Sequence, residues 1–238
     1  MEDETMSLEK PLVHAPVPTL RRLPTYHHYL LRLREEGRPF VSCTHIAEDL
    51  KLYPTQVRKD LAVTGIVGKP KIGYAVEELL ESIESFLSWN DHHSAFLVGV
   101  GGLGSALIGY PGFDRYGFDI VAGFDLDVSK VGTTLHGKRI LDVDKLPGLA
   151  ARMHVHLGII AVPAGAAQVI ADLMIKGGIR AIWNFAPIGL KVPEGIVVHN
   201  EDLAASLAVF LQKHALVSAE QQPGGIQRHV ARSAARRG

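Results

Sequence analysis

The chain has a single cysteine, Cys43, among its 238 residues, which excludes an internal disulfide framework and suggests a reducing compartment. It has no long apolar run, because glycine, proline or charge interrupts every hydrophobic stretch, and a membrane span is therefore not expected. The first ten residues, MEDETMSLEK, are acidic and unlike a secretory signal peptide. We therefore expect a cytoplasmic protein, and a content of 47% apolar against 21% charged residues predicts a globular chain with a real core.

Net charge is also absent, since 25 Lys and Arg balance 25 Asp and Glu. The average hides an uneven distribution. Residues 20–75 carry ten bases and five acids, whereas residues 76–217 carry ten bases and fifteen acids. The flanking residues 1–19 and 218–238 have net charges of −3 and +3. The zero total therefore does not exclude nucleic acid as a partner, because it sums a basic block and an acidic block.

Composition, hydrophobic period and turn residues divide the chain into six parts. We expect an α/β protein with a winged-helix DNA-binding domain at its N-terminus, followed by a Rossmann-type doubly wound parallel sheet. The parts are a disordered leader (1–19), the winged-helix domain (20–75), a linker helix (76–92), the dinucleotide-binding domain (93–200), a C-terminal helix (201–216) and a flexible basic tail (217–238).

The N-terminal domain shows the pattern of a helix-turn-helix. Pro24 suits the first turn of one helix, Ser42 can cap a second, and Pro54 opens a third that Gly65 ends. A short turn separates the second helix from the third, as in DNA-binding proteins. The glycine-rich residues 65–74 follow and permit a tight hairpin, which predicts a wing beside the recognition helix.

Polar side chains of the third helix and the wing are the candidate DNA contacts. Gln56 and Arg58 can read base edges or phosphate in the major groove, and Lys59 suits a phosphate. Asp60 is better explained as a local salt-bridge or cap partner than as a base reader. The candidate DNA-binding residues are Thr55, Gln56, Arg58, Lys59, Lys69 and Lys71.

From residue 95 strands alternate with helices, which predicts a parallel sheet covered on both faces. Its first strand runs directly into Gly99-Val100-Gly101-Gly102-Leu103-Gly104, a G-x-G-x-x-G motif before a helix. Gly99 allows the tight turn, Gly101 the approach of a pyrophosphate, and Gly104 close packing of helix on strand. The motif predicts a dinucleotide site.

An acidic residue stands where such a site needs one. Asp125 ends the second strand, about 20 residues after the motif, where a carboxylate accepts hydrogen bonds from a ribose 2′-OH. A carboxylate there repels a 2′-phosphate, so NAD(H) is favoured over NADP(H). Lys130 is a candidate neighbour of the adenine ribose. Two later loops at strand ends are candidates to frame the nicotinamide half, and they contain Val162, Pro163, Asn184, Phe185, Ala186 and Pro187.

Two other functions remain open from the residues alone. An NAD-dependent oxidoreductase would need an acid or base beside the nicotinamide, and neither loop supplies one. A CoA- or nucleotide-binding module has a similar sheet, although Asp125 suits an unphosphorylated ribose. No set of His and Cys has metal-ligand spacing, and no metal is expected. We expect no catalytic residue and no enzymatic activity.

The order of these parts resembles the Rex family of redox-sensing transcriptional repressors over about residues 20–216. The residues that carry the resemblance are Gln56-Val57-Arg58-Lys59-Asp60-Leu61, Gly73-Tyr74, Val98–Leu107, Tyr110-Pro111-Gly112-Phe113, Phe124–Asp127, Lys130-Val131-Gly132, Val162-Pro163 and Asn184–Pro187. The wing departs from the family pattern, because Thr64, Val67, Pro70 and Lys71 replace two aromatics, an Arg and a Gly. Tyr53-Pro54 likewise replaces a more usual polar cap.

The resemblance implies a bacterial homodimeric repressor. It would bind operator DNA when NADH is scarce and release it when NADH binds, so NADH and NAD+ would be its effectors. It further implies that a C-terminal helix is exchanged between subunits, here residues 202–216 with Leu203, Leu207, Phe210 and Leu211 as its apolar face. By the same resemblance, Tyr110 and Phe113 lie near the nicotinamide and the dimer cleft.

Overall fold

A computed structural model describes residues 15–221, so most of the leader and most of the basic tail predicted above lie outside the described residues. The chain forms two compact units. Unit 1 contains the described residues up to His93 together with Pro111–Phe118, and unit 2 contains Ser94–Tyr110 and the residues from Asp119 onward. The segment Pro111–Phe118 thus leaves unit 2, packs within unit 1 and returns.

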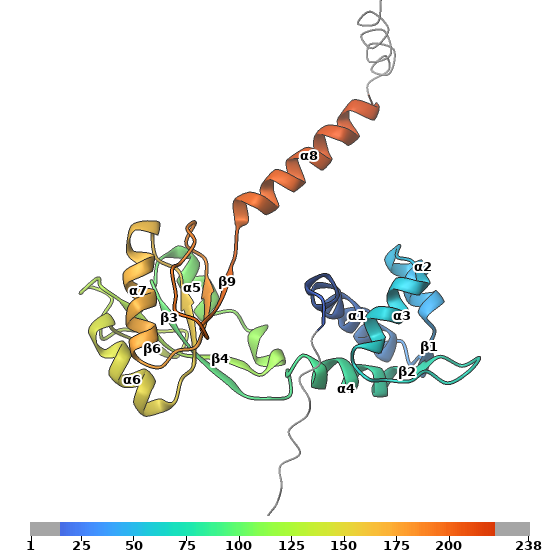
Figure 1. The fold of residues 1–238 in the computed structure, drawn as a ribbon, viewed down its shortest axis with the longest axis horizontal. Coiled ribbons are helices and arrows are strands. Elements are labelled where there is room, and N and C mark those ends of the chain that lie inside the picture. Colours follow the sequence, from blue (N-terminus) through green and yellow to red (C-terminus); the bar gives the residue numbers. More distant parts are fainter. Residues whose placement is uncertain (1–14, 222–238) are drawn as a thin grey trace, which may run out of the picture. The chain divides into compact units, whose positions relative to one another are not determined.

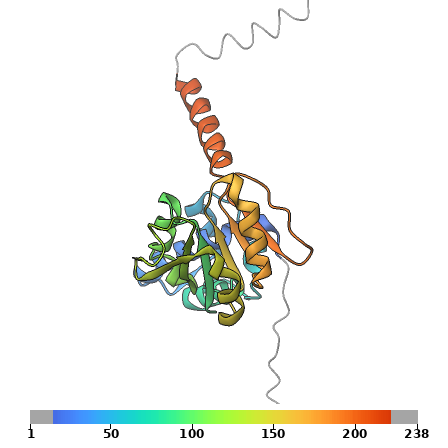
Figure 2. The ribbon, with the colours of Figure 1, turned by 90° about the vertical axis from the view of Figure 1, so that its left-hand side faces the viewer.

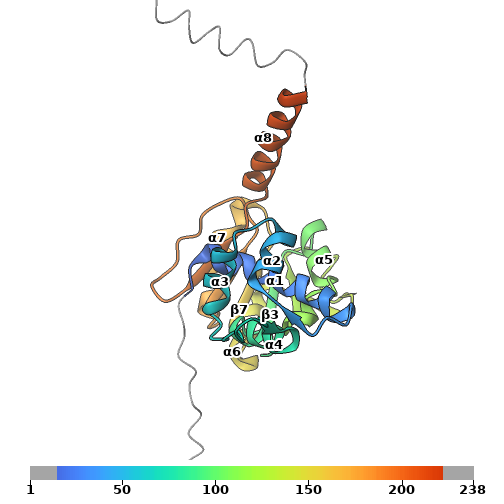
Figure 3. The same ribbon diagram turned by 90° about the vertical axis from the view of Figure 1, so that its right-hand side faces the viewer.

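Unit 1 is a small helical domain with a two-stranded antiparallel sheet. α1 packs against α4 and α3, and α2 packs against α3, as Figure 3 shows from one side. Its elements are α1 (Val17–Glu35), β1 (Phe40–Val41), α2 (Cys43–Leu50), α3 (Pro54–Ala62), β2 (Tyr74–Ala75), α4 (Val76–Phe86) and η1, a 3-10 turn (Phe113–Tyr116).

Two sequence predictions for unit 1 need correction at the start of α1. The first helix begins at Val17, inside the predicted leader, and Pro24 lies in its interior rather than in its first turn. The cause is that Pro16 adopts an extended conformation at the N-cap while Pro18 occupies the first turn, where a missing N–H costs nothing. The prolines near residue 17 therefore mark a helix start and not disorder.

The second and third helices start where the sequence suggested, although α3 has no side-chain cap and ends at Ala62, before the predicted Gly65. Ser42 precedes α2, and its hydroxyl accepts a hydrogen bond from the backbone N–H of His45 at 3.2 Å. Pro54 stands in the first turn of α3. These two positions confirm that the short turn at Lys51–Tyr53 separates a helix-turn-helix pair, in which Lys51 takes the left-handed conformation.

The predicted linker helix belongs to the core of unit 1. α4 contributes Val76, Leu79, Leu80 and Ile83 to a buried cluster with Leu23, Tyr26, Leu30, Ile46, Val57 and Leu61. Burying about ten such side chains is the main stabilising contribution available to a domain of this size. Residues 76–86 are therefore part of unit 1, whereas the sequence prediction ended the N-terminal domain at residue 75.

Unit 2 contains a seven-stranded sheet in the order β5-β6-β4-β3-β7-β8-β9. The edge strand β5 pairs antiparallel with β6, whereas β4 with β6, β3 with β7, β7 with β8 and β8 with β9 pair in parallel. Helices α5, α6 and α7 lie along this sheet (Figures 1 and 2). The strands are β3 (His93–Val98), β4 (Phe118–Asp125), β5 (Thr134–Leu135), β6 (Lys138–Asp142), β7 (Leu157–Ile160), β8 (Ala181–Asn184) and β9 (Val197–Asn200). The helices are α5 (Gly102–Ile108), η2 (Val143–Lys145), α6 (Leu146–Met153), α7 (Ala164–Lys176) and α8 (Leu203–Gln221).

The strand order places the Gly-rich motif at a topological switch point. β3 comes first of the central strands in the chain, and its neighbours β4 and β7 lead the sheet outward in opposite directions. Ligands of doubly wound sheets bind at the carboxyl end of such a strand. Beneath this point the rings of Phe96 and Phe124 pack edge to face, 4.9 Å between centroids, in the core.

Among the described residues, no helix is long and apolar enough to cross a membrane.

Candidate functional site

The Gly-rich loop follows β3 and has the geometry its glycines predict. Gly99 has φ +97°, and a Cβ there would meet the carbonyl oxygen of Ala161 at 2.6 Å. A Cβ on Gly104 would collide with the carbonyl oxygen of Gly99, because α5 packs directly on the turn. Around Gly101 and Gly102 the space is open. The loop is therefore closed on its protein side and open on the side where a pyrophosphate would approach.

Asp125 ends β4 and is tied to the same loop. Its Oδ2 accepts hydrogen bonds from the backbone N–H of Val100 at 2.8 Å and from Lys130 Nζ at 3.0 Å, while Oδ1 accepts from the N–H of Asp127 at 2.9 Å. Burial opposes ionisation of this carboxyl, but the hydrogen bonds outweigh burial and lower its pKa. Asp125 is thus held as an anion at the mouth of the loop.

Lys130 forms an ion pair with the carboxylate of Asp125. Its hydrogen bond to Asp125 raises the pKa of the ammonium, and a longer ion pair of 3.7 Å reaches Asp127. Lys130 therefore lies beside Asp125, while its expected place next to an adenine ribose stays a prediction. The pair keeps a positive charge next to the carboxylate that a ribose would contact.

A cavity of about 310 Å³ opens between these groups. Six residues expected from the sequence line it: Gly99, Gly101, Asp125, Lys130, Val162 and Pro163. Its other apolar walls come from Val98, Leu126, Val143, Ala161, Ala166 and Ile170. Val98, Leu126 and Ala161 lie in the predicted motifs and loop, whereas Val143, Ala166 and Ile170 were not predicted. Ala166 and Ile170 are four apart at the start of α7, and this helical spacing is a sequence signal for that pair. This size and mixture of apolar walls with few polar groups suits a nucleotide base and ribose.

Other predicted residues lie near this cavity in sequence but not among its walls. Val100 supplies the N–H to Asp125, Gly104 packs under the turn, Gly102 opens α5, and Leu103 is exposed on it. Tyr110 is exposed at the last residue before the chain enters unit 1. The structure thus brings Asp125 and Lys130 into one cavity with Val162 and Pro163, which the sequence prediction assigned to the nicotinamide half.

The loop after β8 is shaped from within by Asn184. This side chain is fully buried, and its Nδ2 donates to the carbonyl of Ile188 and to Asn200 Oδ1, each at 2.8 Å. Its Oδ1 accepts from the N–H of Ala186 at 3.0 Å. Asn184 therefore has the role of holding Phe185, Ala186 and Pro187 in place, and its amide is engaged inside the protein.

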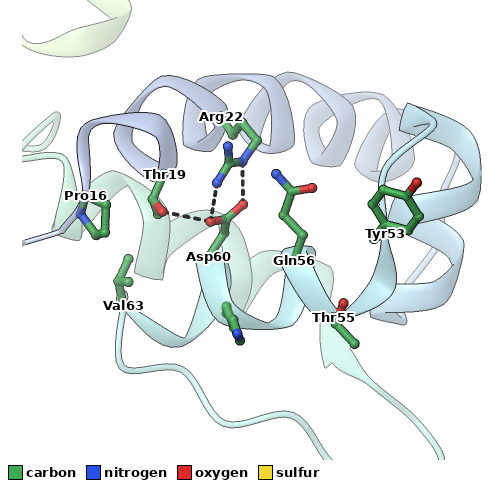
Figure 4. A pocket seen from close by; sticks show the side chains of 9 residues that line it. Pro16, Thr19, Arg22, Tyr53, Thr55, Gln56, Asp60 and Val63 are labelled. Atoms are coloured by element: carbon green, nitrogen blue, oxygen red, sulfur yellow. Dashed lines mark hydrogen bonds and ion pairs between the residues drawn. The ribbon is translucent and has the colours of Figure 1, made fainter.

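On unit 1, α3 presents one polar face. Val57, Asp60 and Leu61 are buried, whereas Thr55, Arg58 and Lys59 are exposed and Gln56 is half-buried. A groove of about 470 Å³ runs along this helix beside the start of α1. Figure 4 shows its lining, which comprises Pro16, Thr19, Arg22, Tyr53, Thr55, Gln56, Lys59, Asp60 and Val63.

Asp60 fastens α3 to α1 in the way the sequence suggested, as a salt-bridge partner. Its carboxylate is 2% exposed and accepts from Arg22 Nε at 2.6 Å, from Arg22 Nη2 at 2.7 Å and from Thr19 Oγ1 at 2.8 Å (Figure 4). Tyr26 Oη adds a fourth hydrogen bond at 2.7 Å. Burial disfavours the anion, but these donors outweigh it and lower the pKa of Asp60. The sequence prediction missed Arg22, for which no motif gave a signal.

The wing is the tight hairpin that its glycines permit, closed by one antiparallel bridge between Lys69 and Gly73. The Lys69 N–H donates to the Gly73 carbonyl at 2.7 Å, and Lys71 at the tip has φ +64°. The strand that follows, β2, pairs with β1 and not with the other arm of the wing. Lys69 and Lys71 are both exposed at this turn, as the sequence predicted, and Lys69 also makes a long ion pair of 3.8 Å to Glu78.

Within the described residues no group of three or more His, Cys, Asp or Glu is arranged to hold a metal ion. Of the histidines, His154 is the left-handed C-cap of α6, and His156 Nδ1 lies 3.1 Å from the carbonyl oxygen of Gly178.

Family models match both units of the chain. One described as "Putative DNA-binding protein N-terminus" matches residues 14–62, and one described as "CoA binding domain" matches residues 90–188. The two matches fall on the helix-turn-helix and on the sheet with its Gly-rich loop.

Similar proteins cover most of the chain. A protein of Treponema denticola named redox-sensing transcriptional repressor Rex is 44% identical over 193 residues, 81% of this chain and 92% of its own length. A Bacteroides fragilis protein of the same name is 43% identical, with coverages of 83% and 90%.

Solved structures agree. The structure of RSP in complex with β-NAD+ and operator DNA has a TM-score of 0.80 at 32% identity, and covers 86% of this chain and 96% of that one. The complex of RSP with β-NADH has a TM-score of 0.77 at 31% identity, with coverages of 87% and 99%.

Proposed function

Because the chain belongs to the Rex family of redox-sensing transcriptional repressors, we propose that it binds operator DNA when NADH is scarce and releases it when NADH binds. The observation that carries this proposal is the carboxylate of Asp125, which is fastened to Val100 at the mouth of the Gly-rich loop. It gives the sheet a ribose-binding anion. On the other unit, α3 offers a polar face for DNA.

In this proposal unit 2 binds the dinucleotide and unit 1 binds DNA. The open backbone at Gly101 and Gly102 would receive the pyrophosphate at the start of α5, and Asp125 would accept from the ribose hydroxyls. On unit 1, Arg58 and Lys59 are exposed on α3 and would contact base edges or phosphates, with Lys69 and Lys71 of the wing contacting phosphate or the minor groove. The relatives of this chain are named transcriptional repressors, which supports a regulatory and not an enzymatic role.

We further propose a homodimer in which α8 is exchanged between subunits. Leu203, Leu207, Phe210 and Leu211 are 53–64% exposed on this helix, and so is Val209 on its other side at 57%. A helix that is apolar on more than one side needs cover on more than one side. A second copy of the chain would supply that cover and would present two recognition helices to a near-palindromic site. Such a protein would act in the cytoplasm.

Switching requires NADH to bind one arrangement of the dimer better than another, since only differential affinity moves an equilibrium. The test is operator binding by the full chain, followed by fluorescence anisotropy of a duplex selected from a random library, with NADH, with NAD+ and without nucleotide. We expect NADH to weaken binding and added salt to weaken it further as phosphate contacts are lost. Equal affinity in all three conditions would contradict the redox switch.

The match to a CoA-binding model makes CoA the informative competitor. A thermal-shift titration with NADH, NAD+ and CoA separates the possibilities, because any ligand of the native state raises its melting temperature. We expect stabilisation by NADH and none by CoA. Stabilisation by CoA alone would favour a CoA-binding module.

A further inference from the structure

Gln56 stands on the exposed side of the recognition helix, next to Arg22 of α1. It lines the same groove as Tyr53, Thr55 and Lys59 (Figure 4). A glutamine amide has one acceptor end and one donor end, and which end it offers to DNA decides which base edge it can match. The residues that contact the Gln56 amide therefore influence which DNA base it can recognise.

Arg22 determines how that amide is oriented. A guanidinium has five donors and no acceptor. In the orientation drawn in Figure 4 the amide NH₂ faces the guanidinium, donor against donor. A half-turn of the amide instead brings Oε1 to 3.1 Å from Arg22 Nη1 and 3.2 Å from Nε, so that it accepts from Nη1 and shares the single Nε hydrogen with Asp60. The second orientation pairs the donors of Arg22 with the acceptor of Gln56, and hydrogen-bond complementarity therefore favours it.

Arg22 cannot turn away to free the amide. Its Nε and Nη2 are held by the two oxygens of Asp60 in a bidentate pair at 2.6 and 2.7 Å. Asp60 itself is buried and further fixed by Thr19 and Tyr26. The guanidinium therefore keeps Nη1 pointed at Gln56, and the amide Nε2 points away from Arg22.

We infer that Arg22 makes Gln56 a donor-only reader of DNA and that the base it selects is guanine. Bidentate recognition of adenine uses both ends of a glutamine amide, and here Oε1 is already engaged. Guanine presents two adjacent acceptors, N7 and O6, in the major groove, whereas adenine places an N6 donor beside its N7. The inference rests on the proposed DNA-binding function and adds the base class that this position reads.

The experiment selects duplexes from a randomised library with the full-length chain, without NADH, for the wild type and for Q56M, Q56E and R22K. Q56M has a similar length and no amide, so the position where its preference disappears is the position that Gln56 reads. We expect guanine there for the wild type, by about tenfold over adenine. Q56E offers only acceptors, so its preference should move to cytosine or adenine, whose amino groups donate.

R22K keeps a positive charge opposite Asp60 but loses the planar fork that holds the amide. Gln56 can then rotate, and we expect adenine to become about as acceptable as guanine at that position. If R22K fails to fold, as judged by its thermal melt, the two Gln56 variants still decide the matter.

Three outcomes overturn the inference: a wild-type preference for adenine, no shift with Q56E, or a loss in Q56M that is uniform across sequences, which would mean a phosphate contact. They leave the proposed function standing. A wild type that selects no sequence at all would instead contradict the proposed function, and the inference with it.

Discussion

The carboxylate Oδ2 of Asp125 and the backbone N–H of Val100 form a hydrogen bond of 2.8 Å, which joins the end of β4 to the first turn of the Gly-rich loop. One residue thereby shapes the loop and presents the anion that a ribose would meet. Replacing it tests both roles, and the choice of replacement separates them.

We predict that Asp125→Asn weakens NADH binding by about tenfold, since a hydrogen bond to a charged group contributes about 1.5–3 kcal/mol and a neutral amide contributes less. The asparagine oxygen can still accept from Val100, so the loop should persist. Discrimination against NADPH should narrow, because the variant no longer repels a 2′-phosphate. Isothermal titration with NADH and NADPH measures both effects.

Asp127→Asn is the matched control, because Asp127 is a half-exposed carboxylate of the same loop that does not line the cavity. Its NADH affinity should stay close to that of the wild type. Unchanged NADH affinity in Asp125→Asn would contradict a hydrogen bond between Asp125 and the ribose.

Alanine substitutions at two glycines of the loop should have different effects, one on NADH binding and the other on the stability of the protein. Gly101→Ala adds a methyl group to open space, so the melting temperature of the ligand-free protein should barely change while NADH binding is lost. Gly104→Ala sets a methyl group against the carbonyl oxygen of Gly99, so the protein itself should be destabilised by roughly 1–3 kcal/mol. Melting curves with and without NADH distinguish the two. Intact NADH binding by Gly101→Ala would argue that no pyrophosphate passes there.

Asp60 should govern the acid stability of unit 1. Asp60→Asn leaves Arg22 without its anion and should destabilise the fold by about 3 kcal/mol at neutral pH. Since the folded-state pKa of Asp60 lies below the ordinary value of about 3.9, its contribution is complete above that value and is lost as the pH falls through the folded-state pKa. The wild type should therefore lose stability below about pH 4 more steeply than the variant.

Urea unfolding followed by circular dichroism between neutral and acid pH measures this difference. Glu77→Gln serves as control, because its ion pair with Arg34 is long, 3.7 Å, and exposed, and such pairs contribute less than about 1 kcal/mol. Parallel acid profiles for the wild type and Asp60→Asn would show that Asp60 does not carry the acid sensitivity.

Sequence patterns predicted correctly those features that depend only on residues close together in the chain. The cap at Ser42, the proline start of α3 and the Gly99–Gly104 turn depend on a residue's own backbone, and all three are as predicted. Patterns failed where a contact joins distant segments. Arg22 meets Asp60 across 38 residues, and the assignment of η1 to unit 1 depends on packing that includes Trp89 against Tyr116, with ring centroids 4.4 Å apart.

The same limit explains the elements the sequence prediction omitted. β5 has two residues, and β6 begins with Lys138 and Arg139, so neither shows a strong apolar period. They are strands because β4 offers an edge for β6, and β6 in turn pairs with β5. α8 shows the converse case, since its sequence predicts a helix with an apolar face and within the described residues that face is left exposed.

That exposed helix gives the last prediction. The double substitution Leu207→Glu with Phe210→Glu should convert the proposed dimer to a monomer at micromolar concentration, because two charges cannot be buried in an apolar contact without a large penalty. Gln212→Glu is the matched control, because it adds a charge at a position that is already polar, and it should weaken the assembly much less than the double substitution. Sedimentation equilibrium gives the masses directly. If the double variant stays dimeric, α8 is not the helix that joins the subunits. If it becomes monomeric and loses operator affinity while its melting curve is unchanged, operator binding depends on two recognition helices held together in the dimer.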